Sequence, residues 1–263
     1  MLRQRDDVNH YLRSLTAKDR SERADGHLAL VLTFVAGAVN AGGFLTVHQY
    51  TSHMSGIVSS MADNLVLGDV ALSIAGLTAF LAFVLGAACS AILVNWGRRL
   101  DLQSAYALPL LLEAALLFSF GAAGGYYQDR LASFVPLAIL LLCFLMGLQN
   151  AIITKISDAR IRTTHVTGLT TDLGIEFGKL IYWNDSKRDP GKPKVRADRK
   201  KLKVLSSLVF SFFSGGVIGA LMFKSAGLAA AMPLAALIAA LAVFPVAGDV
   251  RRAFAKLTGR RDI

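Results

Sequence analysis

The segments GAVNA (residues 37–41) and TSHMSG (residues 51–56) decide the fold of this chain, because each of them occurs a second time. GAVNA returns as GLQNA at residues 147–151, an offset of 110, and TSHMSG returns as TTHVTG at residues 163–168, an offset of 112. The chain contains only five histidines, yet two of them fall at matching positions of this repeat. A chance match is improbable, so the repeat predicts two structurally related halves.

Apolar residues collect in runs of about 20, the length of helix that crosses roughly 30 Å of hydrocarbon. The chain has 263 residues, of which 54% are hydrophobic, and a mean hydropathy of +0.50. These values predict an all-α membrane protein with six transmembrane helices. The predicted spans are residues 28–48, 71–95, 106–126, 133–154, 204–224 and 228–248. Small-residue faces around Gly86 and Gly215 predict that some of these helices pack closely.

Two further segments, residues 51–68 and 163–182, are moderately apolar but contain His, Asp, Asn or Glu. We interpret both as re-entrant or interfacial half-helices, because polar groups and irregular backbone at membrane depth are tolerated where protein buries them or a cavity hydrates them. Each half then consists of a span, a half-helix and two more spans. Three spans are an odd number, so the second half enters the membrane from the opposite side. This predicts the inverted repeat that many transporters use.

Positive charge predicts the orientation of the chain. The net charge is +10, and its Lys and Arg residues lie beside the apolar runs, which is typical of cytoplasmic segments in membrane proteins. No nucleic-acid-binding motif accompanies the charge, so a nucleic-acid partner is not expected. The N-terminal residues 1–27 could be an amphipathic helix on the membrane surface or a disordered basic segment. The predicted organisation is a cytoplasmic basic tail (1–27), a first membrane repeat (28–127), a second membrane repeat (133–248) with a basic cytoplasmic loop (183–203), and a cytoplasmic basic tail (249–263).

The paired Gly-x-x-Asn-Ala and hydroxyl-x-x-hydroxyl-Gly segments resemble the YoaK-like family of bacterial membrane proteins, also called domain of unknown function 1275. The resemblance extends from about residue 28 to 248. It implies a location in the bacterial cytoplasmic membrane and no established activity. Two positions depart from the family pattern: this chain has Asn40 where the family usually has an acid, and Ile57 where it has Asn. A role that needs a carboxylate at position 40 is therefore not available here.

The hydroxyl groups that precede each half-helix are typical of helix N-caps. If the helix N-termini point toward the middle of the membrane, their free amides favour an anionic or strongly polar solute; the alternative is capping with no further role. The duplicated histidines His53 and His165 could shuttle protons or line a pore, since imidazole titrates near neutral pH. They could equally be structural.

Polar residues inside the predicted spans are further candidates. Asn40 and Asn150 could bind a solute or a neighbouring helix. Glu113 has no basic partner in its own span, and a carboxylate there is costly, which favours a functional role over simple burial. The full set of candidate solute-binding or pore-lining residues is Asn40, Thr51, His53, Ser55, Gly56, Glu113, Asn150, Thr163, Thr164, His165, Thr167, Gly168 and Asp172.

The leading hypothesis is a transporter or channel for a small polar or anionic solute at the interface of the repeats, with no cofactor, no metal and no catalytic residue. One alternative is an intramembrane hydrolase that uses Ser55 and His165, although His53 occupies the first position of the Gly-x-Ser-Gly signature. A non-catalytic scaffold or regulator is the other. The expected partners are the lipid bilayer, the solute and anionic lipid at the 187–203 loop, and the sequence allows a homo-oligomer.

Overall fold

The computed structural model describes residues 22–123, 131–157, 164–184 and 193–257, and this described part of the chain is helical without β-strands. The apolar runs form helices because a helix satisfies all of its own backbone hydrogen bonds, which no irregular segment can do in lipid. The helices are α2 (Glu22–Val47), α3 (Met54–Val66), α4 (Val70–Arg99), α5 (Ala107–Ala123), α6 (Leu131–Ile156), α7 (Val166–Ile181), α8 (Arg199–Ala226), the short 3-10 helix η2 (Gly227–Ala230) and α9 (Ala231–Leu257).

Each predicted span coincides with one of the helices α2, α4, α5, α6, α8 and α9. Four segments are long and apolar enough to cross a membrane: Asp25–Val47, Val70–Arg99, Phe134–Ile156 and a 51-residue run, Arg199–Asp249, that takes in α8, η2 and most of α9. Helix α5 is apolar but has only 17 residues.

Two helices extend beyond the predicted spans. Helix α2 begins at Glu22, within the predicted tail 1–27, and α9 continues to Leu257, within the predicted tail 249–263, because helical hydrogen bonding does not stop where the apolar pattern stops. The possible amphipathic helix in the first tail lies mainly outside the described residues, and so does the connection that precedes α6.

The two half-helices end in different ways. After α3 the chain turns tightly at Gly68, whose positive φ of 81° suits glycine, and Asp69 caps α4 by accepting a hydrogen bond from the amide of Leu72. After α7 the connection is long, and Asp198 caps α8 by accepting from the amides of Lys200 and Lys201. Each half-helix lies alongside the helix that follows it.

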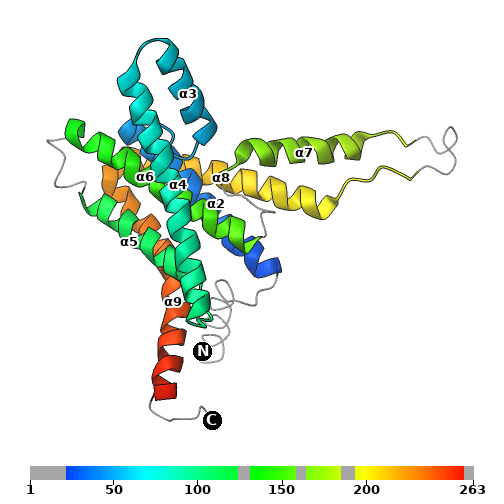
Figure 1. Cartoon of the computed structure of the whole chain (residues 1–263). Helices are drawn as coiled ribbons and strands as arrows, with labels where there is room; N and C mark the ends of the chain where they lie inside the picture. The colour runs from blue at the N-terminus through cyan, green and yellow to red at the C-terminus, as the bar shows by residue number, and fades with distance from the viewer. Residues whose placement is uncertain (1–21, 124–130, 158–163, 185–192, 258–263) are drawn as a thin grey trace.

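The helices pair across the two halves of the chain. Helix α2 packs on α8, α4 packs on α6, and α5 packs on α9, while each half-helix packs on the next helix of its own half. Figure 1 shows the consequence: the long helices cross in a shared centre, from which the α3–α4 hairpin projects toward the top of the view and the α7–α8 hairpin toward the right.

Four glycines permit the two closest crossings. A Cβ added at Gly37 would overlap the backbone carbonyl of Phe212, and one added at Gly215 would overlap that of Phe34. The α4–α6 crossing repeats this reciprocal contact with Gly86 against Phe144 and Gly147 against Phe83. Only glycine lets the backbones approach so closely, which confirms the predicted close packing around Gly86 and Gly215. The common signal is a Phe-x-x-Gly motif that begins at residues 34, 83, 144 and 212.

Burial repeats in the same register. Residues 31–40 of α2 and residues 141–150 of α6 alternate between buried and half-buried positions in an identical order. Equivalent residues of the two halves therefore occupy equivalent environments in the core, as the sequence repeat predicts.

Candidate functional site

Asn40 joins α2 to the segment that precedes α3. Its Oδ1 accepts hydrogen bonds from the backbone amide of Ser52 at 3.2 Å and from the Ser52 hydroxyl at 2.9 Å. Asn40 lies three residues beyond Gly37, about 4.5 Å along the helix axis from the crossing with α8. Because α2 continues for seven residues beyond Asn40, about 10 Å, to Val47, the chain must fold back along α2 before α3 begins.

The second half contains the equivalent contact. Asn150 Nδ2 donates to the Thr164 hydroxyl at 2.6 Å and to the carbonyl of Met146 at 2.9 Å. Asn150 likewise lies three residues beyond a crossing glycine, Gly147, and Thr164 matches Ser52 in the repeat. The chain before each half-helix is thus held about 10 Å inside the C-terminal end of the first helix of its half, at Asn40 of α2 and Asn150 of α6.

The histidines occupy the N-cap positions of α3 and α7, and neither forms a side-chain capping bond. The predicted capping by Thr51, Ser52 or Thr164 is therefore wrong. The reason is competition: the hydroxyls of Ser52 and Thr164 bond to the asparagines, and the buried hydroxyl of Thr51 has no hydrogen-bond partner among the described residues. Thr163 lies outside the described residues.

Each imidazole folds back over the glycine three residues later. A Cβ added at Gly56 would overlap the ring of His53, and one added at Gly168 would overlap the ring of His165. The glycine of each repeated motif therefore makes room for the histidine of the same motif. Both histidines remain exposed on the protein surface, so their rings are available to solvent or solute.

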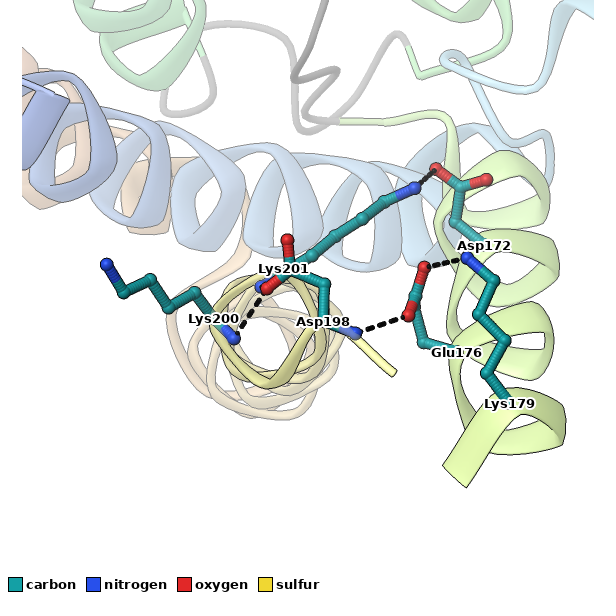
Figure 2. Close-up of polar contacts among 6 residues, drawn as sticks. All are labelled: Asp172, Glu176, Lys179, Asp198, Lys200 and Lys201. Carbon is teal, nitrogen blue, oxygen red and sulfur yellow. Dashed lines mark hydrogen bonds and ion pairs between the residues drawn. The ribbon is translucent and has the colours of Figure 1, made fainter. Parts of the chain in front are cut away.

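The other candidates on the half-helices lie apart from this contact. Ser55 and Thr167 are exposed in the first turns of α3 and α7, and no hydrogen bond joins Ser55 to His165 in the described structure. Asp172 lies farther along α7 and pairs with Lys201 of α8 at 3.3 Å (Figure 2). The described residues contain no group of three or more His, Cys, Asp or Glu side chains that could hold a metal ion.

Glu113 is buried between helices, with 1% of its surface exposed. Its Oε1 accepts a hydrogen bond of 2.8 Å from Nε2 of Gln149, which is also fully buried. The remaining oxygens, Glu113 Oε2 and Gln149 Oε1, have no hydrogen-bond partner within the described ranges. A buried carboxyl group with an unused oxygen is energetically costly, so this pair is a polar site inside an apolar core.

Sequence reasoning did not single out Gln149, although a signal was present. Gln149 matches Val39 in the repeated segment, so it is a polar residue where the other half has an apolar one. Gln149 also directly precedes Asn150. The Glu113–Gln149 pair is thus adjacent to the Asn150–Thr164 contact of the second half and has no counterpart beside Asn40.

An all-helical fold with four apolar segments long enough to cross a bilayer, and with polar side chains buried among them, defines an integral membrane protein. The family model described as "Protein of unknown function (DUF1275)" matches residues 28–244, and the chain belongs to this family. The family predicted from the paired motifs is therefore confirmed.

One curated relative is named "UPF0700 transmembrane protein YoaK", from Bacillus subtilis (strain 168). It is 28% identical to this chain over 171 residues, which cover 61% of this chain and 71% of the relative. No solved structure matches the chain.

Proposed function

We propose that this protein moves a small polar or anionic solute across the bacterial cytoplasmic membrane, as a transporter or channel with its site at the interface of two inverted halves. The observation that carries the proposal is the pair of equivalent contacts, Asn40 with Ser52 and Asn150 with Thr164. They hold the start of each half-helix about 10 Å inside the C-terminal end of α2 and of α6. Half-helices that begin inside the membrane are the element from which many transporters build their solute sites.

Six crossings are the arrangement that best accounts for the helices. The 51-residue run contains two helices separated by η2 and Gly227, whose φ of 58° turns the chain, and its length is about twice what one crossing needs. Helix α5 covers about 25 Å, a mismatch that local thinning of the bilayer accommodates. Helices α2, α4 and α5 then form one half, and α6, α8 and α9 form the other.

The contacts between the halves support their inversion. A rotation that exchanges α2 with α6 and α4 with α8 turns the α2–α8 crossing into the α6–α4 crossing and leaves the α5–α9 pair in place. The reciprocal glycine contacts obey this exchange residue by residue. The axis of such a rotation lies in the membrane plane when each half has three crossings. The basic residues at the end of α4, before α8 and after α9 then share the cytoplasmic side, together with both termini.

The chemistry of the two half-helix starts favours a polar or anionic solute. Within the described residues, neither N-cap histidine caps its first turn with its side chain, so the amides and the positive end of the helix dipole favour an anion there. The exposed imidazoles of His53 and His165 stand at these starts. The residues that we expect to contact solute are Asn40, Ser55, His53, Asn150, Thr167 and His165. Glu113 supplies a buried carboxyl group, which is bonded to Gln149, the residue before Asn150.

Uptake into proteoliposomes tests this proposal. The purified chain is reconstituted, and radiolabelled small anions and polar metabolites are screened for entry. We expect saturable uptake of at least one solute, reduced in a variant that carries Asn40→Ala and Asn150→Ala. Uptake no greater than that of protein-free liposomes across the whole screen contradicts the proposal.

A further inference from the structure

Near the tip of the α7–α8 hairpin lies a cluster of charge in which the acidic residues Asp172, Glu176 and Asp198 form contacts within the protein. Glu176, with 2% of its side chain exposed, accepts from Lys179 Nζ at 2.8 Å and from the backbone amide of Asp198 at 2.8 Å (Figure 2). The hydrogen bond from Lys179, followed by that from Asp198, lowers the pKa of Glu176. Asp198 itself caps α8. These contacts fasten the end of α7 to the beginning of α8.

The basic residues of the same tip are mostly unused. Among the exposed cations that the structure describes at this tip, only Lys201 forms an ion pair, with Asp172. Figure 2 shows the ammonium group of Lys200 pointing away from the carboxylates. Within the described ranges, no carboxylate pairs with the exposed residues Lys194, Arg196, Arg199, Lys200 and Lys203.

The length of α8 puts these cations at the level of lipid headgroups. Gly215 marks the crossing with α2, which we take as the middle of the membrane, and Lys203 and Arg199 precede it by 12 and 16 residues, or about 18 and 24 Å along the axis. Half of the hydrocarbon core is about 15 Å thick, and half of the bilayer with its headgroups is about 20–22 Å. The tilt of a transmembrane helix shortens these depths slightly. Lys200 and Lys203 therefore lie within reach of headgroup phosphates.

Exposed aromatic residues adjoin the cations. Tyr182 and Trp183 directly follow α7, and 59% and 84% of their surface is exposed. The next residue, Asn184, is held beside Val195 by two hydrogen bonds of 2.9 Å. Tyr and Trp prefer the membrane–water interface. Unpaired cations next to interfacial aromatics match the chemistry of an anionic lipid headgroup.

We propose that the tip of the α7–α8 hairpin binds anionic phospholipid through Lys200 and Lys203, with Arg199, Lys194 and Arg196 adding to the attraction, and with Trp183 at the interface beside them. The inference uses the six-crossing arrangement but not transport activity. The α3–α4 tip cannot do the same, because its turn consists of Leu67, Gly68 and Asp69 and has no cation.

Fluorescence of Trp183 tests this site directly. The chain has two tryptophans, so Trp96→Phe leaves Trp183 as a local reporter. The full chain is reconstituted in mixtures of phosphatidylcholine with brominated phosphatidylglycerol or brominated phosphatidylcholine, and relative lipid binding is obtained from quenching. We expect brominated phosphatidylglycerol to be preferred, and each of Lys200→Gln and Lys203→Gln to lower the preference about fivefold, as about 1 kcal/mol per surface cation implies.

The matched control removes two cations elsewhere. Arg99→Gln with Lys224→Gln changes the net charge as much as Lys200→Gln with Lys203→Gln, but acts at the last turns of α4 and α8. The control should retain the preference for brominated phosphatidylglycerol. In the chain with Lys200 and Lys203 intact, added salt should weaken this preference. Equal quenching by the two brominated lipids overturns the proposal, and so does an equal loss in the control. If the cations only set topology, the two lipids bind equally.

Discussion

The two halves of the molecule, α2–α5 and α6–α9, share one plan but differ in two places. They share the Phe-x-x-Gly crossings, the Asn–hydroxyl contact and the histidine that folds over a glycine. They differ at Val39 and Gln149, where only the second half has a buried amide joined to a carboxyl group. They differ also at the hairpin tips, because the α3–α4 turn has no cation and the α7–α8 tip has several. The shared features build the fold, and the differences distinguish the two sides of the molecule.

Breaking the shared crossings should have the largest effect. Gly86→Ala and Gly215→Ala each place a Cβ into a backbone carbonyl of the partner helix, and because backbone cannot move aside cheaply, each should cost about 3 kcal/mol or more. Gly174→Ala in α7 is the matched control: its Cβ would meet nothing within 4 Å, so it should gain up to about 1 kcal/mol of helix stability. Thermal unfolding in detergent measures all three. Similar melting temperatures for Gly86→Ala and Gly174→Ala would show that the α4–α6 crossing does not need a glycine at position 86.

The paired histidines should give the next largest effect, on transport. His53→Ala or His165→Ala should each reduce uptake about tenfold or more, equivalent to about 1.4 kcal/mol, and the double variant should do little further harm, because residues that act as a unit are non-additive. Uptake in proteoliposomes is compared with melting temperature for all three variants. Independent structural histidines would instead lower stability additively, and normal transport in a stable double variant would end the idea of a shared site.

The Glu113–Gln149 pair should affect activity more than folding. Glu113→Gln keeps the shape of the side chain and a hydrogen bond to Gln149 but removes the ionisable group, so we expect a changed rate of uptake or a changed pH dependence in a well-folded protein. Uptake is measured across a series of pH values. If the variant matches the parent protein at every pH, Glu113 is structural and the asymmetry between the halves has no part in transport.

Acid should loosen one hairpin and leave the other unchanged, which is the smallest effect. The contacts of Glu176 lower its pKa from the usual 4.5, so they contribute fully to stability above about pH 4.5, and the contribution falls as the pH drops toward the lowered pKa. Amide hydrogen exchange should therefore speed up at the α7–α8 tip in mild acid but not at the α3–α4 tip. The exchange rates are first corrected for the intrinsic pH dependence of exchange. Equal corrected rates at the α7–α8 tip at pH 4 and pH 6 would show that Glu176 does not fasten this tip.

Much of the fold could be predicted from the sequence, because a lipid-crossing helix needs a long apolar run and the repeat fixes which runs correspond. The ends of the helices could not: α9 continues past its apolar residues to Leu257 because backbone hydrogen bonding sets that boundary. The pairing of the helices also depends on contacts between distant residues, such as Gly37 with Phe212. Only the positions of the small residues indicated where two backbones meet.

The equivalence of the candidate residues in the two halves could be predicted, but not their contacts. The repeat correctly singled out Asn40, Asn150 and the histidines as equivalent positions, but the role of the hydroxyls depends on which neighbour is nearest. Ser52 could bond to a helix amide or to an asparagine, and only the fold places Asn40 within reach. Gln149 was missed because a polar residue within a matched motif looks like part of the repeat until its apolar partner, Val39, is compared with it.

The proposed transport site depends on the inversion of the two halves in the membrane. Single cysteines at Gly68 and Val195, placed at the tips of the two hairpins in a chain without Cys89 and Cys143, can be labelled from either side of intact cells with a membrane-impermeant maleimide. We expect a cysteine at position 68 to be labelled from outside and one at position 195 to be labelled only once the cytoplasmic face is opened. Further single cysteines at positions 129 and 100 should be labelled from outside and from the cytoplasmic face, respectively. Labelling of positions 68 and 195 from the same side would contradict the inverted repeat and with it the proposed transport site.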